Sequence, residues 1–336
     1  MEGAIVTTYR CNAECYMCNT WQYPSSTDEE IDINTLEKLP NNIAFYNVTG
    51  GEPFLREDIE EIISVLNNKS KRIVISTNGY FTDRIIRLSK RYPNIGIRVS
   101  LEGLPAANDE LRGIPDGFDH GLRTILELRH MGVKDIGFGI TVSDRNAKDM
   151  FELLILAHAM DLEFASSVTH NSFYFHKHDN EFQDPEAIAE EFRKVIRKLF
   201  NTYRLKNWFR AYYNHYLINK VMGGPRPLPC ECGTDVFFLD PFGKIRPCNG
   251  RDVIMGDLKE QSFEEIWNGD QAQRVRELVA SCDRHCWMTG SAAPAMKKSV
   301  FRVARWILTN RGRYLHGERV PMFDREPSDP EPNPSL

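Results

Sequence analysis

The sequence predicts an α/β protein with a parallel sheet, followed by a small second unit. Short β-rich runs alternate with segments of helical period from the start to about residue 200, which is the pattern of repeated βα units. The eight cysteines fall into two groups, at positions 11–18 and 230–286. A chain of 336 residues with 41% hydrophobic residues can bury a large core, so it does not need these cysteines as disulfide staples.

Six strands are expected from their β-branched and aromatic content, at residues 4–8, 44–48, 72–76, 97–101, 136–142 and 164–168. Five helices have apolar residues at three- and four-residue spacing, at residues 59–66, 83–91, 118–131, 147–160 and 185–203. Parallel strands joined by helices place their binding loops at the carboxyl ends of the strands. The segments after the strands are therefore where function is expected.

A glycine- and proline-rich run at 223–229 indicates a linker, because it can sustain neither a helix nor a central strand. We therefore predict a first domain at 1–215, a linker at 216–229 and a second domain at 230–290. The second domain has strands at 236–239 and 244–246 and helices at 262–267 and 271–280. A bound metal would help to stabilise so small a unit. An amphipathic helix is expected within 291–316, and a disordered acidic tail at 317–336.

Composition excludes several classes of protein. No apolar run approaches eighteen residues and no export signal precedes the first strand, so we expect a cytoplasmic protein. Clustered cysteines in that compartment indicate metal binding or catalysis. The net charge of -5 gives no global field that would attract nucleic acid.

Cys11, Cys15 and Cys18 form a Cys-x3-Cys-x2-Cys array just after the first predicted strand. Three thiolates on one loop can bind a single metal centre and leave one coordination position open. Sulfur ligands favour an iron-sulfur cluster, zinc or cuprous copper. A zinc knuckle and three unconnected buried thiols are the alternatives.

The segments after the next strands make the sequence similar to a known family. Thr-Gly-Gly-Glu-Pro occurs at 49–53, Ser-Thr-Asn-Gly at 76–79, Ser-Leu-Glu-Gly at 100–103 and Leu-Arg-Gly at 111–113. Together with the cysteine array, this ordered set resembles the radical SAM superfamily. The resemblance implies a partial (β/α)6 TIM-like barrel followed by a small auxiliary-cluster domain of a short β-hairpin plus helices.

The resemblance also implies a reaction. The three cysteines would hold a 4Fe-4S cluster whose open iron binds S-adenosyl-L-methionine, and reduction by flavodoxin or ferredoxin would yield a 5'-deoxyadenosyl radical that abstracts a substrate hydrogen. Gly50 and Gly51 would allow close approach to the methionyl amine, and Glu52 would offset its charge. The candidates for the ribose hydroxyls and the carboxylate are Ser100, Glu102 and Arg112. Asn146 is a further cofactor-binding candidate, for which a helix N-cap is an equal explanation.

The C-terminal cysteines resemble the twitch domain, the shorter relative of the SPASM domain. Four thiolates would saturate a second, auxiliary 4Fe-4S cluster that transfers electrons or supports the fold, and the expected ligands are Cys230, Cys248, Cys282 and Cys286. A zinc ion held by four cysteines is the alternative. Cys232 is left over: it is an inert thiol, a substitute for Cys230, or a hydrogen-atom donor to a substrate radical.

Further residues bear on the substrate. His170, His176 and His178 follow the sixth strand and could act as acid-base groups, although structural roles are favoured. Asp240 could deprotonate a substrate alcohol, but its Asp-Pro-x-Gly context favours a turn. The basic C-terminal helix could meet anionic lipid; packing on the barrel is favoured.

The main functional hypothesis is an oxidoreductase that oxidises a small polar metabolite, of sugar or aminocyclitol type, with the auxiliary cluster as electron acceptor. One alternative is maturation of a ribosomally made peptide. Because only ten residues precede Cys11, another chain would then supply the recognition domain. A redox-neutral epimerase with Cys232 as hydrogen donor is a second alternative. A non-catalytic zinc-binding interaction protein is the hypothesis with least support.

Overall fold

The computed structural model describes residues 1–322 and contains a sheet of nine strands in the order β6-β5-β4-β3-β2-β1-β7-β8-β9. The first six strands are parallel and follow one another in the chain. They are β1 (Glu2–Val6), β2 (Phe45–Thr49), β3 (Ile73–Thr77), β4 (Gly96–Ser100), β5 (Ile136–Val142) and β6 (Glu163–Val168). All six were predicted, within two residues at each end.

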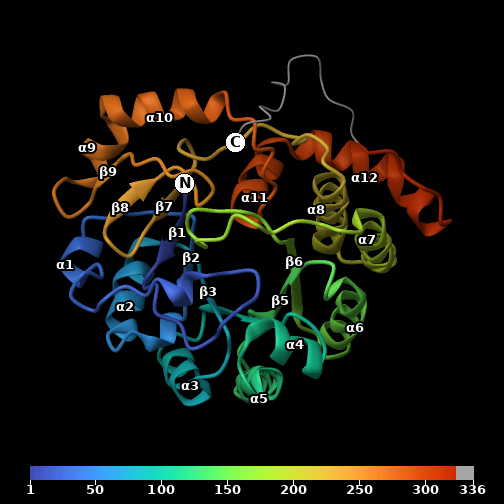
Figure 1. Cartoon of the computed structure of the whole chain (residues 1–336), viewed down its shortest axis with the longest axis horizontal. Helices are drawn as coiled ribbons and strands as arrows, with labels where there is room; N and C mark the ends of the chain where they lie inside the picture. The colour runs from blue at the N-terminus through green and yellow to red at the C-terminus, as the bar shows by residue number, and fades with distance from the viewer. Residues whose placement is uncertain (323–336) are drawn as a thin grey trace.

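The helices that connect these strands form an arc around the sheet (Figure 1). They are α1 (Ile33–Leu36), α2 (Ile59–Lys69), α3 (Thr82–Arg91), α4 (Pro105–Arg112), α5 (Gly117–His130), α6 (Met150–Ala159) and α7 (Pro185–Phe200). Their apolar stripes pack on the sheet, as Ile85 and Leu88 of α3 do, and both are fully buried. This packing directs the carboxyl ends of β1 to β6 toward one common end of the molecule, where the loops with the predicted site residues lie.

The second domain continues the sheet. Strand β7 (Val236–Leu239) pairs in parallel with β1, and β8 (Lys244–Arg246) and β9 (Gly256–Asp257) follow in antiparallel order. Helices α9 (Phe263–Asn268) and α10 (Asp270–Ala280) complete it. The hairpin and both helices were predicted. The pairing of β7 with β1 was not predicted. A unit of this size is too small to bury a core of its own, and through this pairing it shares the core of the barrel.

Helix α8 (Leu205–Val221) corrects the predicted domain boundary. It runs beyond residue 215, so the predicted linker at 216–229 begins inside a helix. The helix was missed because most of its side chains are buried, which removes the amphipathic period that marks a surface helix. Helix α4 was likewise not among the five helices predicted from the sequence.

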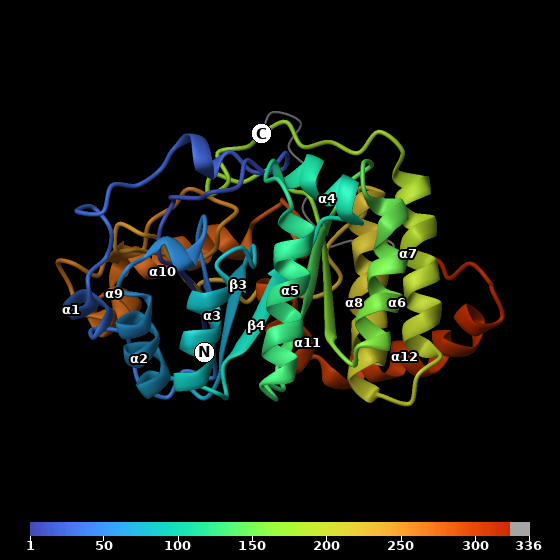
Figure 2. The same ribbon diagram turned by 90° about the horizontal axis from the view of Figure 1, so that it is seen from below.

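The C-terminal segment contains two helices where one was predicted within 291–316. They are α11 (Thr289–Lys298) and α12 (Val300–Leu315). Helix α12 packs against α7 and α8 (Figure 2) through Val303, Ile307 and Tyr314, which confirms packing on the barrel. Within residues 1–322, every helix falls short of the length and apolar character needed to cross a membrane. Most of the predicted tail, residues 323–336, lies outside the described residues.

Candidate functional site

The first cysteine loop leaves β1 and is held in place by its neighbours. The backbone N–H of Glu14 donates to Arg112 O (2.9 Å) and that of Tyr16 donates to Leu111 O (2.8 Å), so the end of α4 fixes the loop. Thr20 Oγ1 lies 2.9 Å from Cys18 Sγ. None of the eight cysteines forms a disulfide, as predicted.

Burial controls the charge of the three thiols. It raises the pKa of Cys11 to about 12 and that of Cys15 to about 11, and it also raises the pKa of Cys18. Neutral thiols would predominate at pH 7 without a cation, whereas a bound metal deprotonates its thiol ligands outright. Three soft, half-buried thiols on one loop, two of which line the cavity, therefore fit an iron-sulfur cluster.

The two glycines after β2 let this segment pack tightly against the cysteine loop. A Cβ on Gly51 would lie 2.2 Å from Arg10 O, and one on Gly50 would lie 2.7 Å from Thr8 O. The N–H groups of Gly51 and Glu52 donate to the same two carbonyls, at 2.8 and 2.9 Å. Close backbone approach thus explains both glycines, and their contact with a methionyl amine stays a prediction.

Glu52 is fully buried and joins the ends of two strands. Its carboxylate accepts hydrogen bonds from Thr77 Oγ1 (2.8 Å), Asn78 N (2.7 Å) and Phe54 N (3.1 Å). Burial raises its pKa, and these hydrogen bonds oppose the rise. The geometry gives Glu52 a positioning role, and its expected role beside the methionyl amine stays a prediction.

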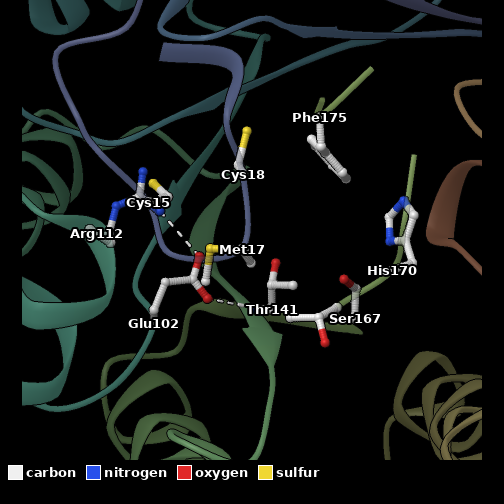
Figure 3. A pocket seen from close by; sticks show the side chains of 10 residues that line it. Cys15, Met17, Cys18, Glu102, Arg112, Thr141, Ser167, His170 and Phe175 are labelled. Carbon is white, nitrogen blue, oxygen red and sulfur yellow. Dashed lines mark hydrogen bonds and ion pairs between the residues drawn. The ribbon is translucent and has the colours of Figure 1, made fainter. Parts of the chain in front are cut away.

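A cavity of about 150 Å³ opens beside the cysteine loop. Figure 3 shows Cys15, Arg112 and Glu102 on one side of it and His170 and Phe175 on the other. Its remaining walls come from Met17, Cys18, Thr141, Ser167 and Thr169. The sequence had predicted the two cysteines, Glu102 and Arg112 as ligands or cofactor contacts.

Arg112 and Glu102 form a buried ion pair on the cavity wall, at 3.1 Å. Glu102 also accepts from Thr141 N (2.7 Å), and burial raises its pKa against the charge of Arg112. Among residues 1–322, Nε of Arg112 is buried without a hydrogen-bond partner. A buried donor without a partner costs free energy, so this atom indicates a site for a bound acceptor.

Two other predicted cofactor contacts, Asn146 and Ser100, do not line this cavity. Asn146 is fully buried and donates to Glu102 O (2.8 Å) and Thr141 O (3.0 Å), while it accepts from Ser143 N (2.7 Å). These bonds tie the loops after β4 and β5 together, and they leave the amide little capacity for a cofactor. Ser100 ends β4 and is not among the residues that line the cavity.

The loop at 169–180 covers the cysteine loop and supplies the opposite wall. Asn180 Nδ2 donates to Met17 O (3.2 Å), and Asn19 N donates to Phe175 O (2.8 Å). Of the three histidines in this loop, only His170 lines the cavity. Burial lowers the pKa of His170 to about 4, and its Nε2 has no partner within the described chain.

The C-terminal cysteines surround a second, smaller cavity, lined by Cys230, Cys232, Cys248, Cys282 and Cys286. Cys232 is buried, and its thiol lies within hydrogen-bonding reach of both Cys230 and Cys248. That contact lowers the pKa of Cys230 to about 6 and of Cys248 to about 7. Cys232 therefore belongs to the second site and does not line the first cavity.

The second cavity also fits a cluster, because its donor set consists of sulfur. Within residues 1–322, no three His, Cys, Asp or Glu side chains are arranged to hold a single metal ion.

Asp240 forms the turn between β7 and β8. Its carboxylate accepts from Phe242 N (3.0 Å) and Lys244 N (2.9 Å) and pairs with Arg246 Nε (2.9 Å). Burial raises the pKa of this carboxyl. The structure thus supports the turn interpretation over a catalytic one.

Sequence profiles agree with this geometry. The profile of the radical SAM superfamily matches residues 5–156, and that of an iron-sulfur cluster-binding domain, SPASM, matches residues 230–287. Together they cover more than half of the chain. The fold and the first cysteine site define a radical SAM enzyme. The chain belongs to the radical SAM superfamily and carries a SPASM-type auxiliary domain, so its cofactors are S-adenosyl-L-methionine and 4Fe-4S clusters.

Similar proteins of known name include synthases of heme and of a porphyrin and a bacteriocin biosynthesis protein. Fe-coproporphyrin III synthase of Methanosarcina barkeri is 31% identical over 158 residues, which span 44% of this chain and only 39% of the relative. AdoMet-dependent heme synthase of the same organism is 25% identical, over 82% of this chain and 85% of the relative. The subtilosin biosynthesis protein AlbA of Bacillus subtilis is 23% identical, over 83% and 62%.

Among solved structures, native anSMEcpe with bound AdoMet and Cp18Cys peptide is similar in fold. Its TM-score is 0.60 at 15% identity, and the match covers 93% of this chain and 99% of that one. Because the chain belongs to the radical SAM superfamily of enzymes, the hypothesis of a non-catalytic zinc-binding protein is excluded.

Proposed function

We propose that this radical SAM enzyme modifies a side chain of a peptide. The size of the first cavity carries the proposal: about 150 Å³, against roughly 300–1,000 Å³ for pockets that enclose a whole drug-sized ligand. This space has to serve both the reactive end of S-adenosylmethionine and the substrate. It therefore suits one projecting side chain, with the rest of the substrate at the open mouth.

The comparisons support a peptide. AlbA is a bacteriocin biosynthesis protein whose similarity extends over 83% of this chain. The protein anSMEcpe, which is similar in fold, was solved with a bound peptide. The oxidation of a sugar or aminocyclitol, our main expectation from the sequence, has less support from these relatives.

The cofactor assignments belong to the same proposal. Cys11, Cys15 and Cys18 would hold the first cluster, and Cys230, Cys248, Cys282 and Cys286 the second. When bound, the first cluster and S-adenosylmethionine supply a 5'-deoxyadenosyl radical that takes hydrogen from an unactivated C–H bond. An electron donor such as flavodoxin or ferredoxin would supply the reducing electron.

Arg112 would hold the methionyl carboxylate. Its Nη1 is paired with Glu102 and its buried Nε is unpartnered, while the residue lines the cavity. A guanidinium donates well-directed, charge-assisted hydrogen bonds to carboxylates. Glu102 orients the guanidinium through its own bond to Thr141 N.

His170 would position the substrate. Its pKa of about 4 keeps the ring neutral at pH 7, and Nδ1 lies 3.4 Å from Val168 O. If Nδ1 carries the proton, Nε2 is an acceptor on the cavity wall for an N–H or O–H of the substrate.

Redox-neutral epimerisation through Cys232 has little geometric support. The thiol of Cys232 lies between Cys230 and Cys248 in the second site and is absent from the walls of the first cavity. A hydrogen donor has to reach the substrate radical, so oxidation or cross-linking of the peptide is favoured.

A second candidate substrate is a tetrapyrrole carboxylate. The heme synthase relative supports it, because their similarity spans 85% of that protein. A rigid macrocycle would have to remain at the mouth of the cavity, with one carboxylate arm inside.

Anaerobic reconstitution tests both candidates. The chain would be loaded with iron and sulfide, reduced with flavodoxin or dithionite, and given S-adenosylmethionine with short peptides encoded beside its gene or with coproporphyrin. We expect peptide-stimulated 5'-deoxyadenosine formation and a peptide that has lost hydrogen, detected by mass spectrometry. Stimulation and turnover by the porphyrin alone would contradict the proposal.

A further inference from the structure

Three arginines line the second cavity, and they bind different partners. Arg226 donates to Cys286 O (2.5 Å), and Arg284 Nη1 donates to Gly250 O. Arg251 differs, because its Nε donates to a sulfur, Cys282 Sγ, at 3.1 Å. This sulfur belongs to one of the four proposed ligands of the auxiliary cluster.

The orientation of Arg251 is fixed from its other side. Its Nη2 donates to Asp283 Oδ1 at 3.0 Å, and both side chains are half-buried. The residue after the proposed ligand thus holds the guanidinium, so that Nε is directed at the sulfur of Cys282. Hydrogen bonds to the side chains that hold a metal affect the properties of the metal site.

Reduction adds one electron, and therefore one negative charge, to an iron-sulfur site. A hydrogen bond from a cation to a ligand sulfur stabilises the reduced form more than the oxidised form, and hydrogen bonds to sulfur are among the factors that set the potential. We propose that Arg251 raises the reduction potential of the auxiliary cluster through its hydrogen bond to Cys282. The auxiliary site is thereby better suited to receive an electron.

This inference rests on the proposed assignment of Cys282 as a ligand of the auxiliary cluster, and its test requires no substrate, so it can fail while the proposed reaction holds. The full chain with Cys11, Cys15 and Cys18 replaced by Ala would be reconstituted anaerobically, so that only the auxiliary cluster contributes a signal. Its midpoint potential would be measured by dithionite titration followed by electron paramagnetic resonance. In this background, we expect Arg251→Gln and Arg251→Met to move the midpoint to a more negative value.

Arg274→Gln is the matched control. It removes the same charge from an exposed position on α10, where Arg274 binds Gln271, and we expect no shift. An unchanged midpoint in the Arg251 variants with iron retained, or a shift equal to that of the control, would overturn the proposal. Loss of the cluster from both variants would overturn it as well, because Arg251 would then serve cluster binding.

Discussion

The arginines beside the two cysteine groups differ in whether their donors have hydrogen-bond partners. Beside the first site, Arg112 Nε and His170 Nε2 are buried without partners in the described chain. Around the second, Arg226 and Arg284 donate to backbone carbonyls and Arg251 to a sulfur. Buried polar groups are nearly always hydrogen-bonded. The unpartnered Arg112 Nε therefore favours the first site as the one that receives a bound acceptor, whereas the three arginines of the second cavity already have partners.

The loop at 169–180 connects the two sites. Ser172 Oγ donates to Asn249 O, next to Cys248, while Asn180 Nδ2 donates to Met17 O, next to Cys18. One segment thus contacts both cysteine groups and also lines the cavity through His170 and Phe175. The two sites are therefore joined structurally, although different parts of the sequence encode them.

The largest expected effect separates the roles of the two sites. Cys18→Ala should remove about half of the iron, since each 4Fe-4S cluster needs its thiolate ligands, and abolish 5'-deoxyadenosine formation. Cys248→Ala should also remove about half of the iron but retain 5'-deoxyadenosine formation without completed product. Iron content and chromatography of the products measure both. A normal product yield from Cys248→Ala would contradict the expectation that the auxiliary cluster is needed to complete the product.

Arg112→Lys tests whether the unpartnered guanidinium holds the cofactor. A buried hydrogen bond to a charged group contributes about 1.5–3 kcal/mol, so we expect Kd for S-adenosylmethionine to rise roughly 10- to 100-fold. Equilibrium binding to the reconstituted protein measures this. Arg129→Lys, on the exposed face of α5, is the control. Equal affinity in both variants would remove Arg112 from the cofactor site.

The sequence predicted best those features that depend on local pattern. Strand alternation and β-branched content located β1 to β6, and the Cys-x3-Cys-x2-Cys spacing located the first site. The pairing of β7 with β1 joins residues more than two hundred positions apart, and no local pattern encodes it. Helix α8 was missed because burial on most sides erases its period.

The same limit applies to the sites. Arg112 and Glu102 were candidates because the resemblance to the radical SAM superfamily implied them, and the structure places both on the cavity wall. Arg251 could not be found in this way, since its role depends on a contact with Cys282 across 31 positions. The Asp-Pro-x-Gly context already favoured a turn for Asp240, and the hydrogen bonds of the fold support it. For Asn146, a helix N-cap was an equal explanation, and the hydrogen bonds place its side chain at a junction of two loops.

His170→Gln should have a smaller effect than Arg112→Lys. Loss of one neutral hydrogen bond costs about 0.5–1.5 kcal/mol, so product formation should fall up to about 10-fold while 5'-deoxyadenosine formation continues. The ratio of 5'-deoxyadenosine to product measures this uncoupling. His178→Gln, at an exposed position of the same loop, is the control. Unchanged coupling in His170→Gln would exclude a positioning role.

His170 also predicts a pH dependence of stability. Burial lowers its pKa from 6.5 to about 4, so below pH 6.5 the unfolded chain binds a proton that the folded chain does not. The free energy of unfolding should therefore fall by up to about 2 kcal/mol between pH 6.5 and 5. His170→Gln should lack this part of the loss, as denaturant unfolding at both pH values would reveal. Equal pH dependence in the two proteins would contradict the burial of a neutral ring.

The smallest expected effect concerns α12, whose residues line neither cysteine cavity. Its inward face is committed to α7 and α8, whereas Leu308 is 77% exposed. Leu308→Glu should therefore change stability by no more than about 0.5 kcal/mol and leave co-sedimentation with anionic vesicles unchanged. Val303→Glu, on the buried face, should destabilise the fold. If the wild-type chain binds vesicles and Leu308→Glu abolishes that binding, the helix has a lipid-binding role instead. The exposed side chain would then make an interaction that the packing of α12 does not explain.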